Sequence, residues 1–369
     1  MTERSLDTSH LYTIVLAGGS GTRFWPASRR ALPKQLLALG KAPDSSLIAE
    51  TVKRVEPLCP AERVVVATST RLIDATRRAL PALPNSSFLG EPAARNTAPC
   101  IAWATAVIAR RDPQAFVMVL PSDHHIGEPE RFRQVLLLAL ASAQSAITTV
   151  GIEPTRPDTG YGYIERGAAV SDGVYDVARF VEKPNRERAE EYLRGGRHLW
   201  NSGMFFFRAT DLLAAVARFA PEIWANIERI EAAASRGAEA EAEATRAAFA
   251  AMPSISIDYA VMEKASPLRV VPGSFGWSDL GSWESAWELA DKDAQGNSVT
   301  EHAVYVDARN NLVVDHSSRA RDKVVALVGV ENLCVVQTED ALLVIPRERS
   351  QDVRAIVEAL EKANRHDKL

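Results

Sequence analysis

Short runs of apolar, β-branched residues alternate with helical patterns over the first third of the chain. The apolar runs that predict buried strands cover residues 11–17, 63–67, 88–90 and 115–120. The segments between them that space apolar residues as a helix does are 46–55, 70–80 and 100–110. This alternation predicts an α/β domain with a Rossmann-like, mostly parallel sheet.

The pattern changes twice further along the chain. After residue 148 it predicts strands at 161–165, 177–182 and 204–207 and helices at 184–195, 211–219 and 222–250. Past residue 294 it predicts only short strands, at 303–306, 312–314, 324–328, 333–336 and 341–345, and a closing helix at 350–363. Asn310-Asn311 is typical of a hairpin turn. We therefore expect a catalytic domain over residues 1–293 and a small β-rich domain over 294–369.

A glycine-rich loop follows the first predicted strand. Gly18, Gly19 and Gly21 leave backbone N–H groups that no side chain shields from an anion. Arg23 adds a planar fork for phosphate oxygens, and Lys34 adds a mobile point charge. These residues point to a polyphosphate ligand, although a strand followed by two glycines is also typical of a plain tight turn.

Three other glycine loops fit this stretch poorly. A Walker loop ends in Gly-Lys-Ser/Thr, whereas Thr22-Arg23 follows Gly21 here. A dinucleotide fingerprint needs a third glycine, where this chain has Phe24, and an acid after the second strand. The other parts of the kinase signature set are missing. A nicotinamide dehydrogenase is therefore disfavoured.

Two aspartates are candidates for a metal site. Asp123 follows the strand predicted at 115–120, and Asp279 lies in the sequence Trp-Ser-Asp-Leu-Gly-Ser-Trp. Two carboxylates at strand ends can hold one Mg²⁺, a hard cation that also binds phosphate oxygens and water. Taken alone, either residue is equally typical of a turn or a helix cap.

Composition and charge restrict the partners. The net charge of −4, without a lysine or arginine block, gives no electrostatic case for nucleic acid. Three scattered cysteines predict a reducing compartment rather than a disulfide framework or zinc site. The polar first ten residues lack the apolar core of a signal peptide, and no apolar run approaches the ~18 residues of a spanning helix. We expect a cytoplasmic protein with no membrane partner.

The glycine-rich loop continues into a longer motif, GGSGTRFWPASRRALPKQ, at residues 18–35. This segment, here called the glycine stretch, is similar to the signature of the sugar-nucleotide pyrophosphorylases. Its Phe-Trp and Pro-Lys-Gln resemble the variant found in bacterial mannose-1-phosphate guanylyltransferases. Further matches follow in order: Pro-Ser-Asp-His around Asp123, Val-Glu-Lys-Pro around Lys183, Trp-Asn-Ser-Gly around Asn201, and the motif around Asp279.

The resemblance implies a nucleotidyltransferase fold with a β-helix-like C-terminal fragment, and transfer of GMP from GTP to mannose 1-phosphate with Mg²⁺. A homodimer is compatible with it. The sequence ends before the isomerase domain of longer, bifunctional relatives, so that second activity is not implied. The alternatives are another sugar 1-phosphate such as a heptose or glucose phosphate, another nucleotide, or a non-catalytic sugar-nucleotide sensor.

The resemblance also assigns roles to residues. Arg23, Lys34 and Lys183 are the expected catalytic residues, and Asp123 and Asp279 the metal ligands. The nucleotide is assigned to Gly18, Gly19, Gly21, Thr22, Glu91, Asn96 and Thr97. The sugar phosphate is assigned to Tyr161, Gly162, Glu182, Lys183, Asn201 and Asp258. Guanine presents both donors and acceptors, which the types of Glu91 and Asn96 can match, although Asn96 or Thr97 is equally typical of a helix cap.

Overall fold

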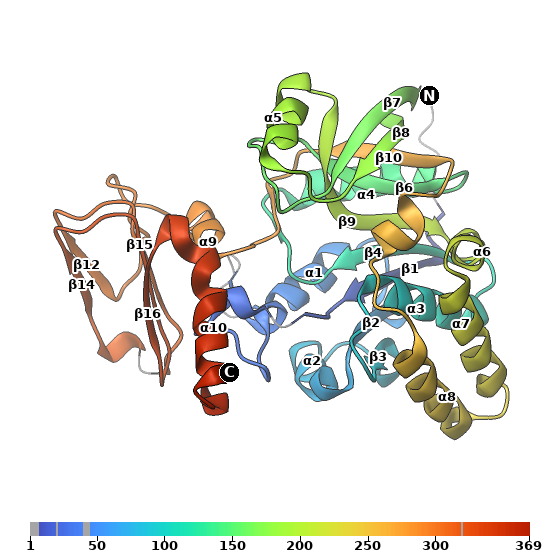
Figure 1. Cartoon of the computed structure of the whole chain (residues 1–369), viewed down its shortest axis with the longest axis horizontal. Coiled ribbons are helices and arrows are strands. Elements are labelled where there is room, and N and C mark those ends of the chain that lie inside the picture. The colour runs from blue at the N-terminus through green and yellow to red at the C-terminus, as the bar shows by residue number, and fades with distance from the viewer. Residues whose placement is uncertain (1–6, 20, 40–44, 319) are drawn as a thin grey trace. The chain divides into compact units, whose positions relative to one another are not determined.

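The computed structural model describes residues 7–19, 21–39, 45–318 and 320–369 (Figure 1). The chain forms two compact units, and each is built from separate segments. The first unit comprises Met1–Gly18, Thr51–Ser122 and Ile126–Trp277. The second comprises Gly19–Glu50, Asp123–His125 and Ser278–Leu369. Most of the glycine stretch therefore folds with the C-terminal part of the chain.

Among the described residues of the first unit, nine strands form one sheet in the order β3-β2-β1-β4-β9-β6-β10-β8-β7. They are β1 (Leu11–Leu16), β2 (Val64–Ser69), β3 (Phe88–Glu91), β4 (Phe116–Pro121), β6 (Ile147–Ile152), β7 (Tyr163–Ser171), β8 (Val174–Val181), β9 (His198–Arg208) and β10 (Leu268–Gly273). Pairing is parallel from β3 to β4 and between β6 and β10, and antiparallel elsewhere. The two-residue connection between β7 and β8 permits only an antiparallel pair. The α/β fold class is confirmed, but the sheet is mixed rather than mostly parallel, because among the described strands beyond β4 only the pair β6–β10 is parallel.

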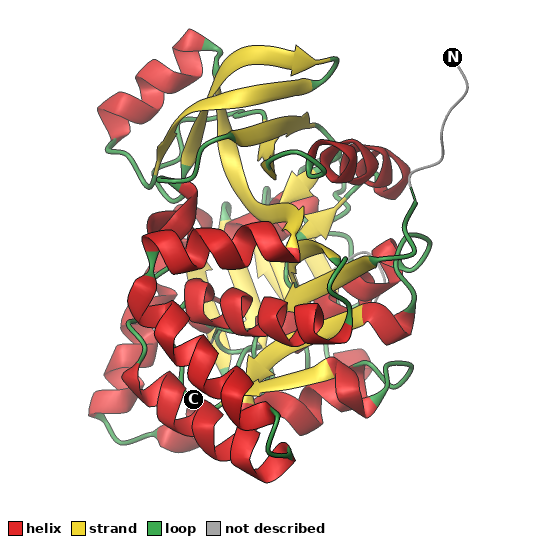
Figure 2. Ribbon diagram, turned by 90° about the vertical axis from the view of Figure 1, so that its right-hand side faces the viewer, coloured by secondary structure: helices red, strands yellow, loops and turns green. Residues whose placement is uncertain are grey.

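Helices cover this sheet (Figure 2). They are α2 (Ile73–Ala79), α3 (Thr97–Arg111), α4 (Pro129–Ser142), α5 (Arg186–Gly195), α6 (Ala209–Phe219), α7 (Pro221–Ala234) and α8 (Ala238–Ala251), while α1 (Leu47–Val55) crosses the division between the units. Helix α3 is buried from Ala98 to Ile108 and packs against α6 and α7. The single helix predicted at 222–250 is wrong: Gly237, with φ of 117°, separates α7 from α8, because that backbone conformation cannot continue a right-handed helix.

Parallel strand pairs organise the second unit. Strand β12 (Ala303–Val306) pairs with β14 (Val325–Val328), and β13 (Leu312–Asp315) pairs with β15 (Leu333–Gln337). Strand β16 (Leu342–Pro346) runs antiparallel to β15. Pairing each strand with the next but one in the chain is the arrangement of a β-helix coil.

The hairpin predicted at Asn310-Asn311 is therefore wrong. This pair turns the chain from β12 into β13, and these two strands are not partners. Asn310 takes the left-handed conformation at the corner. The buried side chain of Asn311 donates to Asn297 Oδ1 (3.0 Å) and accepts from the backbone N–H of Leu333 (3.0 Å). An asparagine pair that resembles a hairpin turn thus ties successive coils together.

The glycine stretch supplies part of this unit's hydrophobic core. One buried cluster contains Phe24, Trp25 and Ala27 of this stretch and Leu37 just beyond it, together with residues of β13, β15, β16, α9 (Trp283–Leu289) and α10 (Val353–Lys362). The Phe24 ring meets Trp283 edge-on at 4.9 Å, and the Thr22–Phe24 turn contacts α10, which is red in Figure 1. In the described part of the chain, no helix combines the length and apolar character needed to cross a membrane.

Candidate active site

Gly21 brings the two ends of the glycine stretch together. Its φ of 57° is left-handed, and a Cβ on it would lie 2.6 Å from Lys34 Cβ and 2.7 Å from Lys34 N. Only glycine fits such an approach to a neighbouring backbone. Ser28 Oγ then donates to the Gly21 carbonyl oxygen (2.7 Å). This local folding sets Lys34 beside the glycine loop.

Lys34 joins the two proposed metal ligands. Its buried side chain donates to Asp123 Oδ2 (2.8 Å) and to the backbone carbonyl oxygen of Asp279 (2.5 Å). Burial raises the pKa of Asp123, but the charges of Lys34 and His124 outweigh that effect and lower it overall. Asp123 is therefore held as a carboxylate within hydrogen-bond distance of a cation.

The two aspartates flank one pair of strands. Asp123 lies two residues before β5 (His125–Ile126), and Asp279 directly follows β11 (Trp277–Ser278), which pairs with β5. Next to Asp279, Leu280 has a positive φ of 47°, and a Cβ on Gly281 would lie 2.9 Å from Asp279 Oδ2. A larger residue at position 281 would therefore crowd the Asp279 carboxylate.

The chemistry of this cluster suits a hard cation. Among the residues that the structure describes, no group of three His, Cys, Asp or Glu side chains could hold a metal by itself. Two carboxylates fit an ion that takes its remaining ligands from substrate phosphates and water.

Arg23 lies in the short turn Thr22–Phe24, ahead of this cluster in the same unit. Its guanidinium Nη1 donates to Gln351 Oε1 at 3.4 Å, a long contact to a residue shortly before α10. Both Arg23 and Thr22 are only partly buried. The Arg23 fork is consequently accessible to a phosphate oxygen.

A second cluster, in the first unit, contains the residues assigned to the sugar phosphate. Lys183 follows β8 with a left-handed φ of 43° and forms an ion pair with Glu182. A Cβ on Gly162 would lie 2.4 Å from Glu182 Oε2, so glycine leaves room for that carboxylate. The backbone N–H of Asn201 donates to the Gly162 carbonyl oxygen (2.8 Å). Segments from three parts of the sequence therefore meet here.

Asp258 completes this second cluster. Asn201 Nδ2 donates to Asp258 Oδ1 (2.8 Å), and Asp258 begins a short π-helical turn, Asp258–Met262. Burial raises the pKa of Asp258, the nearby Glu182 charge raises it further, and the Asn201 hydrogen bond opposes both. Burial also raises the pKa of Glu263, and the charges of Glu182 and Asp258 raise it further. Acidic and amide groups of this kind suit sugar hydroxyls.

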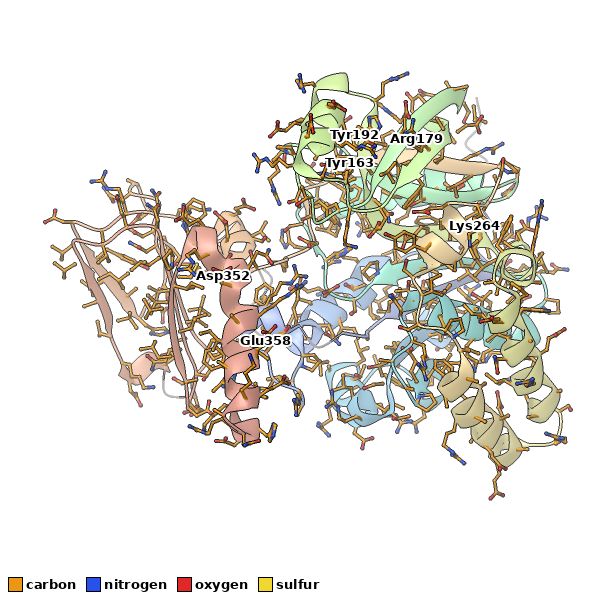
Figure 3. The ribbon with its side chains drawn as sticks, viewed as in Figure 1. Tyr163, Arg179, Tyr192, Lys264, Asp352 and Glu358 are labelled. Atoms are coloured by element: carbon orange, nitrogen blue, oxygen red, sulfur yellow. The ribbon has the colours of Figure 1, made fainter. Side chains whose placement is uncertain are left out.

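Aromatic rings border this cluster. Tyr161 lies 5.0 Å from Trp200 and 5.5 Å from Trp277, measured between ring centroids. Tyr192 of α5 stacks on His198 (3.9 Å) and lies 5.3 Å from Tyr163, which Figure 3 labels beside it. These contacts fix the beginnings of β7 and β9, next to Gly162 and Asn201.

The residues assigned to the base lie around the start of α3. Asn96 caps this helix, its side chain accepting from the backbone N–H of Thr97 (2.9 Å). Thr97 Oγ1 accepts from the backbone N–H of Ile257 (2.9 Å), the residue before Asp258. Burial raises the pKa of Glu91, against a hydrogen bond with the Cys100 thiol. The prediction that Asn96 caps this helix is therefore correct. Glu91 is half-buried at the end of β3.

Sequence reasoning left some neighbours of these clusters without a role. Ser28 lies in the glycine stretch and Trp277 in the motif around Asp279, but their contacts depend on the folded chain. Glu263 follows Asp258 by five positions in the sequence, and its charge interaction with Glu182 shows that it belongs to the second cluster. Its short separation from Asp258 is the signal that the sequence offered.

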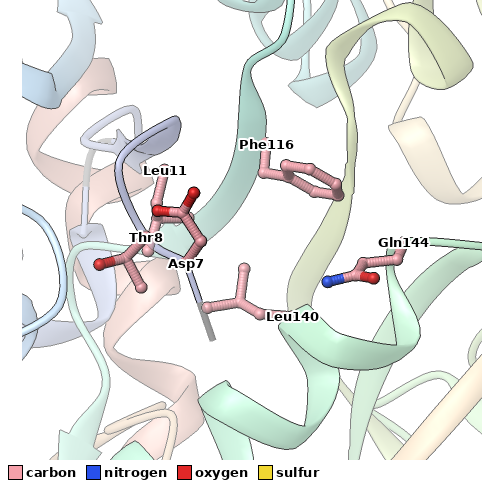
Figure 4. A pocket seen from close by; sticks show the side chains of 6 residues that line it. All are labelled: Asp7, Thr8, Leu11, Phe116, Leu140 and Gln144. Atoms are coloured by element: carbon pink, nitrogen blue, oxygen red, sulfur yellow. The ribbon is translucent and has the colours of Figure 1, made fainter. Parts of the chain in front are cut away.

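Two cavities lie apart from the proposed site residues. One, of about 20 Å³, has room for about one water and is lined by Asp7, Thr8, Leu11, Phe116, Leu140 and Gln144 (Figure 4). The other, of about 480 Å³, lies in the second unit between Leu39, α9 and β13 and reaches His125. Among the described residues that line them, none is assigned to substrate or metal.

Comparison with known proteins places this arrangement in a class. Residues 12–296 match the nucleotidyl transferase family, and residues 301–360 match the MannoseP isomerase/GMP-like beta-helix domain. The fold is that of a nucleotidyltransferase with a β-helix domain, and members of this family generally use a divalent metal. More particularly, the chain belongs to the mannose-1-phosphate guanylyltransferase family.

Individual relatives match almost the whole chain. A mannose-1-phosphate guanylyltransferase from Klebsiella pneumoniae is 41% identical over 363 residues, which are 97% of this chain and 75% of that protein. The xanthan biosynthesis protein XanB of Xanthomonas campestris pv. campestris (strain B100) is 40% identical, with the same shares covered. A crystal structure from Thermus thermophilus, described as a mannose-1-phosphate geranyltransferase, is 34% identical with a TM-score of 0.85, covering 95% of this chain and 99% of that one.

Proposed function

We propose that this chain transfers GMP from GTP to α-D-mannose 1-phosphate, giving GDP-mannose and pyrophosphate. The observation that carries the proposal is the contact of Lys34 with both Asp123 and Asp279 in a chain of this family. A phosphate oxygen of the sugar phosphate attacks the α-phosphorus of GTP, the bond to the β-phosphate oxygen breaks, and pyrophosphate leaves. This reaction depends on positioning and charge neutralisation rather than on a protein nucleophile.

The glycine stretch binds the triphosphate in this mechanism. Backbone N–H groups of Gly18, Gly19, Gly21 and Thr22 face phosphate oxygens. Arg23 and Lys34 neutralise the charge that develops on the leaving pyrophosphate. Because the Lys34 ammonium contacts Asp123 and the Asp279 carbonyl oxygen, it also neutralises the Asp123 carboxylate when no substrate is bound.

Asp123 and Asp279 are the residues that would hold Mg²⁺. When bound, the ion neutralises phosphate oxygens and orients them for the transfer. The low pKa of Asp123 keeps this ligand ionised across the physiological range. Asp279 directly follows β11, and the pairing of β11 with β5 also positions Asp123.

The second cluster receives the sugar phosphate, and the start of α3 receives the base. Glu182, Asn201 and Asp258 bind the hydroxyls, with Tyr161 and Gly162 shaping the pocket. Lys183 places the attacking phosphate. Glu91, Asn96 and Thr97 lie beside the guanine, and the Thr97–Ile257 hydrogen bond connects them to the sugar-binding cluster.

We expect Lys183→Ala to raise the KM for mannose 1-phosphate by about 10- to 100-fold, because a charge-assisted hydrogen bond to phosphate contributes roughly 1.5–3 kcal/mol. The KM for GTP should change by less than about twofold. Steady-state kinetics with each substrate varied in turn will measure this. Arg186→Ala removes a neighbouring cation that pairs instead with Glu190 (2.9 Å) and serves as the control. Equal weakening of both substrates would show that Lys183 is misassigned.

A substrate matrix tests the proposal against its alternatives. Pyrophosphate release should be measured for ATP, CTP, GTP and UTP, each with mannose, glucose and heptose 1-phosphates. We expect GTP with mannose 1-phosphate to give the highest kcat/KM. A different preferred pair would identify another sugar nucleotidyltransferase, and binding without turnover for every pair would identify a sensor.

The wider setting is part of the same proposal. We propose a cytoplasmic enzyme, acting on small molecules without nucleic-acid or membrane partners, whose chain divides functionally into residues 1–293 and 294–369. A homodimer is the proposed assembly. Light scattering during size-exclusion chromatography will measure the mass of the assembly. A mass equal to one chain at micromolar concentration would contradict that assembly.

A further inference from the structure

Residues of the segment Ser278–Leu369 bind the glycine stretch directly. Trp25 Nε1 donates to the Lys368 carbonyl oxygen (2.8 Å), and Trp283 Nε1 donates to the Trp25 carbonyl oxygen (3.1 Å). Arg29 Nη2 donates to Asp340 Oδ1 (2.9 Å). All these residues belong to the second unit. The stretch that carries Arg23 and Lys34 is thus held from a part of the chain more than 300 positions away.

Asp340 is the centre of these contacts. Its Oδ1 accepts from Arg29 while its Oδ2 accepts from Lys368 Nζ, each at 2.9 Å, and Thr338 Oγ1 donates to Oδ1 (3.2 Å). The hydrogen bonds from Lys368 and Arg29 lower the pKa of Asp340 to about 2. Arg29 is only 17% exposed and Lys368 only 24%. A partly buried network of three charges contributes more to stability than an isolated surface ion pair does.

Arg29 lies in the tight turn between the two cationic residues. Its backbone N–H donates to the Leu32 carbonyl oxygen (2.9 Å), and the Leu32 N–H donates back to Arg29 (3.0 Å). Lys34 follows Leu32 after one proline, and Ser28, just before Arg29, holds Gly21. A change in the position of Arg29 would therefore displace Lys34, which follows it in the chain, and the glycine loop, which Ser28 holds.

We propose that Asp340 is a positioning residue, which acts through Arg29 and Lys368 to hold the glycine stretch in the geometry required by Arg23 and Lys34. The proposal rests on the proposed function for its kinetic consequence. The β-helix domain then takes part in the reaction through the loop that it supports. Asp340 itself need not touch a substrate.

The test combines kinetics with hydrogen exchange of the full-length protein. Asp340→Ala should lower kcat by about 5- to 20-fold, as expected for loss of a coupled contact, and change the KM for mannose 1-phosphate by less than about twofold. The amides of Arg29 and Leu32 should exchange about tenfold faster or more. Asp340→Glu, which keeps the carboxylate, should recover part of both effects. Asp340→Asn, which is nearly isosteric, replaces the alanine variant if that protein fails to fold.

Asp352→Asn is the matched control. Asp352 pairs with Arg349 (2.8 Å) just before α10, where Figure 3 labels it, and this pair lies within the C-terminal segment. The control should change neither kcat nor exchange at Arg29. Unchanged kcat in Asp340→Ala would overturn the proposal, and so would a loss of kcat with faster exchange throughout both units. Exchange requires no substrate, so it reports on the loop even if the wild-type chain releases no pyrophosphate, a result that would contradict the proposed function instead.

Discussion

Asparagine at Asp123 or at Asp279 is expected to lower kcat by about 100-fold or more, and the double substitution should cost far less than the product of the two losses. Each change keeps the shape of the side chain and one oxygen but removes a unit of negative charge. Groups that act as one unit show this non-additivity. The expected loss of kcat in each single variant is the size seen when one electrostatic interaction with the transition state is removed from a preorganised active site.

The structure supports treating the two residues as a pair. Asp123 and the Asp279 backbone share the Lys34 ammonium, and both residues flank the strands β5 and β11. The measurement is a double-mutant cycle on kcat at several Mg²⁺ concentrations. Each single variant should require more Mg²⁺ for half-maximal rate.

Asp74→Asn is a suitable control for this cycle, because that side chain is 82% exposed on α2 and pairs with Arg77. Its kcat and Mg²⁺ requirement should match those of the wild type. Two independent, multiplicative losses at positions 123 and 279 would indicate two separate sites. Full wild-type activity in EDTA would eliminate the metal from the mechanism.

Arg23→Ala is expected to lower kcat by roughly 10³-fold, at the lower end of the range for arginines at phosphoryl transition states. The melting temperature should change little, since Arg23 is partly exposed and its contact to Gln351 is long. Arg23→Lys should recover only part of the rate, because it keeps the charge and loses the planar fork. Kinetics and thermal unfolding of the same preparations will separate the two effects.

Arg309→Ala provides the matched control, as Arg309 is 69% exposed and pairs with Glu331 in the same unit. We expect it to leave both kcat and the melting temperature unchanged. A near-normal kcat for Arg23→Ala would remove Arg23 from the mechanism. A loss of rate matched by an equal loss of folded protein would assign it a structural role.

Local sequence pattern predicted most elements of the first unit and the five short strands of the second. Buried strands such as β1 and β4 could be predicted because an uninterrupted apolar run needs cover on both faces. Strand partners in the β-helix could not, because they depend on how successive coils stack. For the same reason Asn310-Asn311 looked like a hairpin turn although Asn311 bonds across coils.

The candidate site shows a similar division. The motifs predicted which residue types carry the chemistry, and the structure brings Lys34 to both aspartates and Asn201 to Asp258. The support from Asp340 could not be predicted, because its contact with Arg29 spans 311 positions and depends on side-chain geometry at both ends. The proposed division at residue 294 stays a prediction, and the glycine stretch packs with the C-terminal segments.

Product analysis tests most directly whether this chain makes GDP-mannose by direct transfer. The purified chain should be incubated with GTP, mannose 1-phosphate and Mg²⁺, and its nucleotides and phosphates resolved by ³¹P NMR. We predict that GDP-mannose and pyrophosphate appear in equal amounts, and only when both substrates are present. Release of GDP or GMP with phosphate and no GDP-mannose would contradict direct transfer of GMP to mannose 1-phosphate.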